Sequence, residues 1–595
     1  MKQLKYPFDS DYILRKKQSI KRELLADETR KYIDKKIAIL CGSTANEIKD
    51  ILELFLLDQG IRPSFYMSEY NRYWEDVIFD NPELRAFGPD IIYIHTTSRN
   101  VQRWPKVSDS AEAVNECLNE TFGRFYAVWE KIAEDYQCVT IQNNFEQPSY
   151  RLLGNKDVSD IHGRTNFANS LNARMYEYAQ THSNFYIHDI NYMASCYGIQ
   201  RWADPTYWYL YKYAMTLRAV PEFSFNLSNI IKSIYGKNKK AFVLDLDNTL
   251  WGGIIGDDGA ENIEIGQETA RAELFSEFQA YLKAHKDIGI MLNVDSKNYE
   301  ETALEGLNRP DSVLKPEDFL IIKANWNPKD RNLVEIAEEI NIGQDSLVFV
   351  DDNPAERHII SGLDGVAVPE LGDPETYINI LDRSGFFEVT ELSADDLKKN
   401  SMYKANVERK RQQADFADYG EYLRSLEMTA EIAPFKDMYM SRISQLTNKS
   451  NQFNLTTKRC SVADIQRFAE DPQYITLYGR LQDKFGDNGV VAITFGHEDE
   501  NGTFHIDLWI MSCRVLKRNM EQAMMDELVR RCRERDIREL RGYYYPTVKN
   551  KMVEEFYKEM GFERVFLDEA GNSEWKLPVD GYNAMNKYIE IKLEE

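Results

Sequence analysis

Two aspartates, Asp245 and Asp247, directly follow the apolar run AFVL at residues 241–244. Such a run predicts a buried strand of an open α/β sheet, in which ligands bind at the carboxyl ends of the strands. One carboxylate placed there can attack phosphorus and form a transient aspartyl phosphate. The other can act as acid and base on the leaving group and on the incoming nucleophile. These two residues therefore predict a phosphoryl-transfer site.

Polar residues also follow the next three predicted strands of this segment. Ser296 offers a hydroxyl group to a phosphoryl oxygen, and Lys329, in NWNPK, offers an ammonium group. We also expect Thr249 and Asn298 to bind the substrate. A single Asp-x-Asp pair is more often a turn or a solvated strand end. Four elements in this order instead favour a site that acts on a phosphorylated small molecule.

A carboxylate pair, Asp351 and Asp352, completes the fourth element. Mg²⁺ binds oxygen ligands, which usually come from one or two carboxylates, water and substrate phosphate. We predict that Asp245, the backbone carbonyl of Asp247 and Asp351 bind Mg²⁺. Asp352, like Lys297, could equally lie outside the direct contacts of the site.

Composition narrows the class of protein. Lys and Arg number 73 against 97 Asp and Glu, so the formal net charge is −24. This charge repels polyanions, and we expect no nucleic-acid partner. The chain has no run of 18 apolar residues and no signal-peptide pattern, which predicts no membrane segment and a cytoplasmic location. Seven cysteines without a Cys-x-x-Cys pair argue against disulfides and a zinc site.

The chain of 595 residues is too long for one hydrophobic core, and its patterns divide it into segments. Apolar strand patterns that alternate with helical patterns predict two parallel α/β domains, and the last part predicts an α+β domain. The expected segments are an N-terminal segment (1–35), an α/β domain (36–231), a second, doubly wound α/β domain (240–390), a helical connector (391–427) and an α+β domain (428–595).

Two of these segments carry more detailed expectations. In the connector, Ser393 precedes Asp396 by three residues, which is the spacing of a capping box. We expect few long-range contacts to cross this charged connector. In the last domain, we expect long helices at residues 520–535 and 549–560.

The string LDLDNTLWGGIIGDDG at residues 244–259, followed by SKN, NWNPK and FVDDNPAER, resembles the FkbH-like family of the haloacid-dehalogenase (HAD) superfamily. The segments LTNKSNQFNLTT (446–457) and DKFGDNG (483–489) resemble C-terminal signatures of that family, so the likeness covers about residues 36–570. The resemblance implies an SGNH-like α/β domain, a HAD-like doubly wound parallel sheet and a GNAT-like α+β domain.

Members of this family take a glyceryl unit from 1,3-bisphosphoglycerate, remove phosphate and place the acyl group on the phosphopantetheine thiol of an acyl carrier protein. The resemblance implies this class of activity, with Mg²⁺ and an acyl carrier protein as partner, but it does not fix the substrate. A stand-alone HAD small-molecule phosphatase is the alternative. A nonenzymatic scaffold for carrier proteins is disfavoured by the intact four-element site.

The N-terminal domain departs from the SGNH pattern. Ser43 lies where an SGNH serine would be, and Asn143 or Asn144 could supply an oxyanion donor. A downstream Asp-x-x-His, which an SGNH hydrolase also needs, is missing, and His188 has the wrong spacing for it. A lone histidine is more often a satisfied polar residue than a catalyst. We therefore expect a noncatalytic or docking domain.

The C-terminal domain departs from the GNAT pattern. Residues 513–521 lie where a GNAT fold cradles a pyrophosphate on the N–H groups at a helix N-terminus. Lys517 and Asn519 stand where glycines usually permit the close approach of a backbone, which weakens the case for coenzyme A. Arg514, Lys517 and Arg518 could still bind the single phosphate of phosphopantetheine. 

Cys513 has two interpretations, which the sequence leaves open. Its thiolate, next to Arg514 and a helix N-terminus, could carry a transient acyl thioester. It could equally be an inert cysteine buried in a strand. We include Cys513 among the predicted catalytic residues and Asn451, in NKSNQFNLTT, among the predicted substrate-binding residues.

Overall fold

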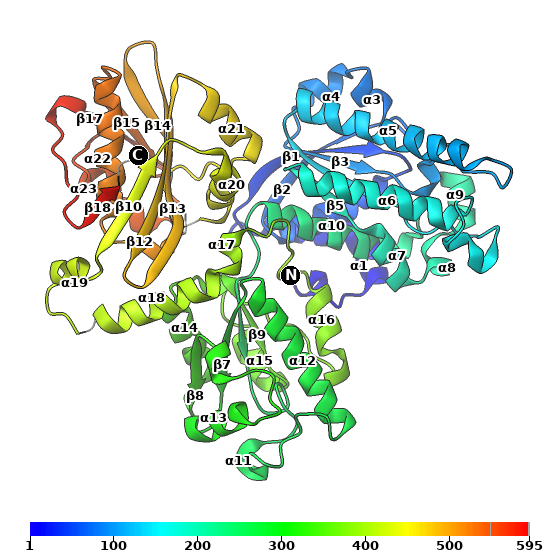
Figure 1. Ribbon diagram of the computed structural model, residues 1–595, viewed down its shortest axis with the longest axis horizontal. Helices are drawn as coiled ribbons and strands as arrows, with labels where there is room; N and C mark the ends of the chain where they lie inside the picture. Colours follow the sequence, from blue (N-terminus) through cyan, green and yellow to red (C-terminus); the bar gives the residue numbers. More distant parts are fainter. Residues whose placement is uncertain (414, 451, 548, 593–595) are drawn as a thin grey trace. The chain divides into compact units, whose positions relative to one another are not determined.

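The computed structural model describes residues 1–413, 415–450, 452–547 and 549–592 (Figure 1), without the side chains of residues 394, 395, 449 and 513. The chain forms two units, Met1–Ile234 with Ser461–Asp464, and Tyr235–Cys460 with Ile465–Glu595. No helix in the described ranges is long and apolar enough to cross a bilayer.

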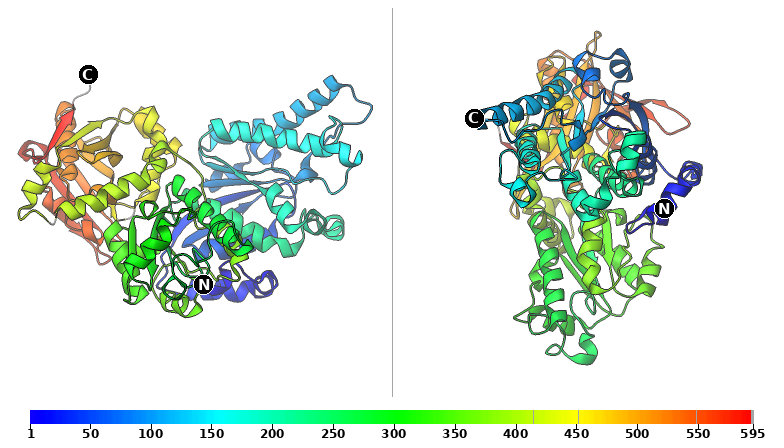
Figure 2. Two further views of the ribbon diagram at one scale, coloured as in Figure 1. Left: turned by 60° about the horizontal axis from the view of Figure 1, so that its bottom comes forward. Right: turned by 90° about the vertical axis from the view of Figure 1, so that its right-hand side faces the viewer.

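The first unit is built on a parallel sheet, which confirms the predicted α/β pattern of this part. The strand order is β2 (Ile61–Met67), β1 (Ile33–Cys41), β3 (Ile91–His95), β4 (Val139–Asn143) and β5 (Phe185–His188). Helices α5 (Ala111–Asp135) and α6 (Arg164–Thr181) pack on one face. Helices α2 (Asn46–Asp58) and α10 (Val220–Ile234) lie on the other face (Figure 2). Two covered faces explain why strands β3 and β4 are buried along their whole length.

The second sheet carries the candidate site. Its four strands are parallel, in the order β8 (Ile321–Ala324), β7 (Met291–Ser296), β6 (Ala241–Leu244) and β9 (Leu347–Val350). Alternate side chains of a strand point to opposite faces. Phe242 therefore packs with α12 (Ala270–Asp287), whereas Val243 packs with α14 (Lys329–Ile340). The expected parallel sheet with helices on both faces is confirmed.

The connector is helical, as predicted. It contains α17 (Ala394–Leu397), α18 (Lys399–Gln413) and α19 (Tyr419–Ser425). The predicted capping box is confirmed, because the N–H of Asp396 donates to Ser393 Oγ and the N–H of Ser393 donates to Asp396 Oδ2.

Helix α18 contacts both of its neighbours in the sequence. Tyr403 and Val407 are buried in the apolar cluster that α14 forms on the second sheet. On the C-terminal side, Arg409 Nη2 lies 2.6 Å from Asp483 Oδ1, and both side chains are buried. The expectation that few long-range contacts cross the connector is therefore wrong, because a charged helix can bury its apolar residues on one surface and one of its two arginines on another.

The third sheet is mixed. Its strand order is β16 (Glu563–Leu567), β17 (Ser573–Pro578), β15 (Glu539–Tyr544), β14 (Thr503–Met511), β13 (Gly486–Glu498), β12 (Tyr474–Asp483), β10 (Met428–Ala433) and β18 (Ile589–Lys592). Helix α22 (Met520–Glu534) packs against β12 and β13 and confirms the helix predicted at residues 520–535. 

The second helix predicted for this part, at residues 549–560, is wrong. The stretch contains a short 3-10 turn and only the brief helix α23 (Phe556–Glu559). Asn550 explains the difference, since its buried Nδ2 donates to the carbonyl oxygens of Asn454 at 2.8 Å and Tyr545 at 2.9 Å. These bonds tie the turn to distant backbone and override local helix propensity.

Candidate active site

The strand order of the second sheet brings the predicted phosphoryl-transfer residues together. Strand β6 lies between β7 and β9, so Asp245, which follows β6, lies between Ser296 at the end of β7 and Asp351 after β9. Parallel strands present their carboxyl ends at one edge of the sheet, where open α/β folds bind ligands. Lys329, the first residue of α14, reaches the same edge.

Lys329 bridges two buried carboxylates. Its Nζ lies 2.8 Å from Asp245 Oδ1 and 2.6 Å from Asp351 Oδ2. Burial alone would lower the pKa of Lys329, but the charges of Asp245 and Asp351 outweigh burial and raise the pKa above its usual value. The lysine therefore keeps its charge and lowers the repulsion between the two acids.

Asp247 is fixed beside Asp245 by three hydrogen bonds. Its Oδ1 accepts from Trp251 Nε1 at 2.9 Å and from the N–H of Ile255 at 3.1 Å. Its Oδ2 accepts from Asn298 Nδ2 at 3.0 Å, and the same nitrogen donates to Ser296 Oγ at 3.1 Å. Asn298 thus joins Asp247 to Ser296 by hydrogen bonds, and the predicted roles of the three residues stay predictions.

Three carboxylates lie close enough to share a cation. Asp245, Asp351 and Asp352 each have an oxygen within 4.8 Å of the other two. Burial and then the charge of Asp245 raise the pKa of Asp351 to about 6, and the same causes raise the pKa of Asp352. The three carboxylates outnumber the single ammonium group of Lys329, so the cluster has an excess of negative charge. All of its possible ligand atoms are oxygens, which Mg²⁺ prefers.

Asp352 therefore belongs to the candidate metal site, which the sequence had left open. The carboxylate of Asp247 is not part of that cluster, and the predicted role of its backbone carbonyl stays a prediction. Thr249 is fully buried, and its hydroxyl accepts a hydrogen bond from the N–H of Asp352 at 3.2 Å. This bond joins the turns after β6 and β9. Lys297 forms an ion pair with Glu356 beside the site.

Asn332 and Asp295, which the sequence analysis did not assign to the site, hold the start of α14, where Lys329 lies. Asn332 Nδ2 donates to Asp295 Oδ1 and to Asn325 Oδ1, both at 3.0 Å. Burial raises the pKa of Asp295 to about 7. These bonds tie the start of α14 to β7 and so position Lys329. Asn332 lies three residues after Lys329, so both side chains are on the same face of α14. Nothing in the local sequence predicts that Asn332 contacts β7.

Ser43, in the bend after strand β1, has a histidine neighbour that the sequence analysis missed. Ser43 Oγ lies 3.0 Å from His95 Nε2, and His95 Nδ1 lies 3.1 Å from Asn143 Nδ2. The expected partner was the histidine of a downstream Asp-x-x-His, whereas the partner found is His95 at the end of strand β3, which pairs with β1. Both side chains are fully buried, and burial lowers the pKa of His95 to about 3. The expected noncatalytic role of this domain stays a prediction.

The structure does not bring the three C-terminal cations together on an exposed surface. Arg514 and Arg518 are buried, whereas Lys517 is exposed. Arg518 Nη1 lies 3.3 Å from Asp483 Oδ2, and its Nη2 donates to Asn406 Oδ1 of α18 at 2.9 Å. Arg514 contacts α18 through Met402. The two arginines therefore serve the packing of this domain on α18, and their predicted role with phosphopantetheine has no support in these contacts.

The turn before α22 takes the backbone conformation that glycine favours, although it has none. Lys517 and Asn519 have φ values of 61° and 70°. The sequence analysis placed these two residues where glycines usually stand but did not predict this backbone conformation. Asn451 lies outside the described residues, as does the side chain of Cys513, so their predicted roles stay predictions.

Comparisons with known proteins found one family model and several solved structures that match parts of this chain. Residues 36–232 match the family described as FkbH, N-terminal domain. No curated protein matches. Among solved structures, the N-terminal part of BF1531 from Bacteroides fragilis, described as containing a phosphatase domain complexed with Mg, is 28% identical with a TM-score of 0.58. That match covers 63% of this chain and 99% of BF1531 as solved.

Smaller structures match a part of the chain. The ribosomal-protein-S18-alanine N-acetyltransferase from Escherichia coli is 11% identical with a TM-score of 0.20, and the match covers 25% of this chain and 94% of that one. A putative acetyltransferase of the GNAT family from Desulfovibrio desulfuricans is 14% identical with a TM-score of 0.21, and the match covers 26% and 99% of the two chains.

Proposed function

We propose that this chain is a Mg²⁺-dependent phosphohydrolase of the HAD type. The observation that carries the proposal is the placement of Lys329 between Asp245 and Asp351, with Asp352 beside them, at the carboxyl edge of a parallel sheet. The similarity to a phosphatase-containing structure solved with Mg supports it. Asp245, Asp351 and Asp352 would hold the ion, which would screen the charge of the phosphoryl oxygens.

The side chains divide the proposed reaction among them. Asp245 attacks phosphorus through the oxygen that Lys329 does not hold, a P–O bond to Asp245 forms, and the P–O bond to the leaving group breaks. Asp247 gives the leaving group a proton and then takes one from the water that hydrolyses the aspartyl phosphate. Lys329 and Ser296 stabilise the charge that develops on the transferring oxygens.

The proposal extends to acyl transfer, as the FkbH-like resemblance implies. The phosphorylated substrate is then of the acyl-phosphate type, such as 1,3-bisphosphoglycerate, and the Asp245 site removes its phosphate ester. A thiol attacks the acyl carbonyl, so that a C–S bond forms and the C–O bond to the acyl phosphate breaks, and the glyceryl group ends on the phosphopantetheine thiol of an acyl carrier protein. The match of residues 36–232 to the FkbH N-terminal domain supports this half. The C-terminal, GNAT-like domain would hold the transfer site, with Cys513 as a candidate carrier of the acyl group.

One incubation tests both halves. The full chain, Mg²⁺, 1,3-bisphosphoglycerate and candidate holo-carrier proteins are combined, phosphate is measured by colorimetry, and carrier proteins are weighed by intact mass spectrometry. We expect phosphate release together with a carrier that gains the mass of the glyceryl group. Phosphate release with every carrier unchanged would instead support the stand-alone phosphatase.

A further inference from the structure

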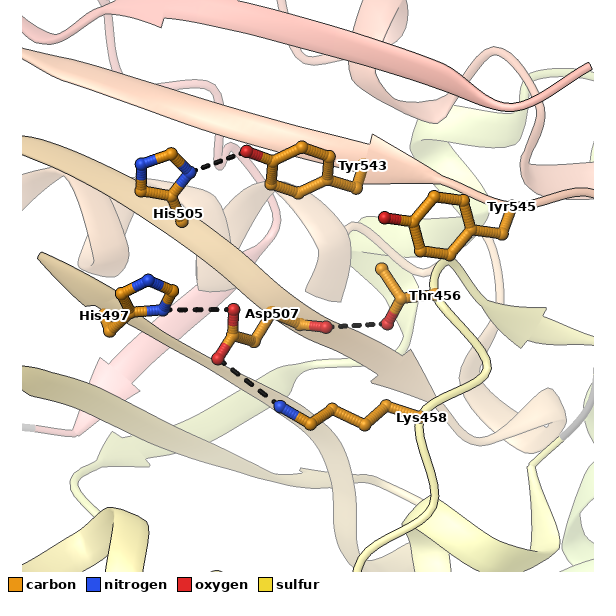
Figure 3. Close-up of a pocket in the computed structure, with 7 residues that line it drawn as sticks. All are labelled: Thr456, Lys458, His497, His505, Asp507, Tyr543 and Tyr545. Atoms are coloured by element: carbon orange, nitrogen blue, oxygen red, sulfur yellow. Dashed lines mark hydrogen bonds and ion pairs between the residues drawn. The ribbon is translucent and has the colours of Figure 1, made fainter. Parts of the chain in front are cut away.

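A second polar pocket lies in the C-terminal domain, built only from residues of the third sheet and the segment next to it. Its volume is about 460 Å³. Figure 3 shows the side chains that line it, which are Thr456, Lys458, His497, His505, Asp507, Tyr543 and Tyr545. None of these residues takes part in the phosphoryl site.

The pocket forms where two parallel strands separate. Strands β14 and β15 pair only between residues 503–505 and 539–541. Beyond that point Leu455 lies between them, because its N–H donates to the carbonyl of Trp509 and its carbonyl accepts from the N–H of Tyr545. Side chains two residues apart lie on the same face of a strand. His505 and Asp507 of β14 therefore line the pocket together, as do Tyr543 of β15 and Tyr545, which directly follows it.

One imidazole in this pocket is oriented as a base. His497 Nδ1 lies 3.2 Å from Asp507 Oδ1, and Asp507 Oδ2 lies 3.5 Å from Lys458 Nζ. A carboxylate at Nδ1 keeps the proton on that nitrogen, which leaves the lone pair on Nε2. Within the described residues no hydrogen-bond partner of Nε2 is found, and 41% of the His497 side chain is exposed. The pair therefore presents a free base to the pocket (Figure 3).

The neighbouring histidine, His505, differs from His497 because both of its ring nitrogens have partners. His505 Nδ1 lies 2.6 Å from the Tyr543 hydroxyl, and its Nε2 lies 3.5 Å from Asp499 Oδ2. The rings of His497 and His505 stack with centroids 5.3 Å apart. Burial, and then the charge of Glu574, raises the pKa of Tyr543 to about 12, so this phenol keeps its proton. Both nitrogens of His505 are thus engaged, and only His497 is free to act.

The charges and the base indicate the class of ligand. Lys458 and Asp507 offset each other, so the lining is polar without a net charge to attract an anion or an ammonium ion. Thr456, Tyr543 and Tyr545 add hydroxyl groups. A thiol, with a pKa near 8.5, loses its proton without much help, whereas an alcohol needs a base. The pocket fits a neutral molecule with several hydroxyl groups.

We propose that this pocket is a second active site, in which His497 activates a hydroxyl group of a small neutral polyol or sugar as acyl acceptor. The acceptor oxygen attacks the carbonyl carbon of an acyl thioester, a C–O bond forms and the C–S bond breaks. The hydroxyl proton passes to His497 Nε2 and from there to the leaving thiolate. Asp507 is the positioning residue. The thioester is the product named under the proposed function, and the inference rests on that function for its natural donor.

The test supplies the donor, so its outcome does not depend on phosphate release or carrier loading. The full chain is incubated with a synthetic glyceryl thioester of N-acetylcysteamine and with glycerol or methyl glucoside, and ester products are measured by mass spectrometry. We expect ester formation that His497→Gln lowers by between about 10²- and 10⁴-fold. Asp507→Asn should lower kcat while the KM for the acceptor stays the same. His358→Gln, an exposed histidine on the second sheet's α15 (Pro354–Ile360), is the matched control and should keep the full rate.

Two results would overturn the proposal. One is the absence of enzyme-dependent ester with both acceptors. The other is an unchanged rate for His497→Gln whose thermal unfolding midpoint equals that of the unaltered protein. Ester formation here, together with no phosphate release and no carrier loading in the incubation with 1,3-bisphosphoglycerate, would contradict the proposed function and leave the pocket assigned.

Discussion

Lys329 holds its ammonium group 2.8 Å from Asp245 and 2.6 Å from Asp351. The charge is most valuable when negative charge develops on the transferring oxygens, so its loss should affect the transition state more than substrate binding. We expect Lys329→Ala to lower kcat by roughly 10²-fold or more, with a smaller rise in KM. Steady-state kinetics of phosphate release measure both. An unchanged kcat with only a higher KM would count against this role.

The sequence predicts which individual residues belong to the candidate site, but it predicts fewer of the contacts between them. Asp245, Ser296 and Asp351 stand at the ends of apolar strand patterns, and Lys329 stands in the segment that follows another. The strand order brings all four together. The contact of Asn332 with Asp295 joins a helix to a strand 37 residues away. No spacing rule reports such a contact, because it depends on how the helix packs.

The end of strand β5 buries a second uncharged histidine. Burial, and then the repulsion that a proton on His188 would meet from a protonated His95, lowers the pKa of His188 to about 3. An unfolded chain binds a proton near pH 6.5, whereas the native His188 does not, so stability is present above pH 6.5 and is lost as the pH falls toward 3. Between pH 7 and pH 5 the first sheet should lose about 2 kcal/mol through this residue.

Hydrogen exchange of β4 and β5, corrected for intrinsic rates at each pH, measures that loss. His188→Gln should show a smaller loss between pH 7 and pH 5, whatever its stability at pH 7. His358→Gln, which removes an exposed histidine, should show the same loss as the unaltered protein. An equal loss in His188→Gln and the unaltered chain would show that this histidine is not buried neutral.

Elements were predicted well where one physical signal dominates. The apolar strands of the two parallel sheets and the periodic helix α22 are such cases, because burial on one or both faces leaves a clear pattern. The stretch at residues 549–560 has helical composition, yet Asn550 binds distant backbone there. Tertiary hydrogen bonds of this kind are invisible to local propensity.

At the scale of the whole molecule, α18 decides where the chain can be divided. Tyr403 and Val407 complete an apolar cluster on the second sheet. Burying two such side chains stabilises by roughly 3–6 kcal/mol, as an upper estimate. A fragment that ends at residue 413 should therefore unfold at a higher temperature than one that ends at residue 392. Differential scanning calorimetry of both fragments tests this, and equal midpoints would show that α18 adds nothing to the second sheet.

The same fragments separate the proposed activities. The one that ends at residue 413 keeps the whole candidate phosphoryl site and should still release phosphate. It lacks residues 428–595 and should not load a carrier protein. Carrier loading by this fragment, detected by intact mass, would contradict the assignment of acyl transfer to the C-terminal domain.

The assignment of Asp245 as nucleophile is the claim on which the account depends, and phosphate release by Asp245→Asn tests it most directly. An amide can neither attack phosphorus nor supply a charge to the metal, so release should fall by more than ~10³-fold. Asp364→Asn, which removes an exposed carboxylate from the same domain, is the matched control and should keep its activity. With circular dichroism unchanged in both variants, more than a tenth of the original turnover in Asp245→Asn, on any phosphorylated substrate, would contradict the account.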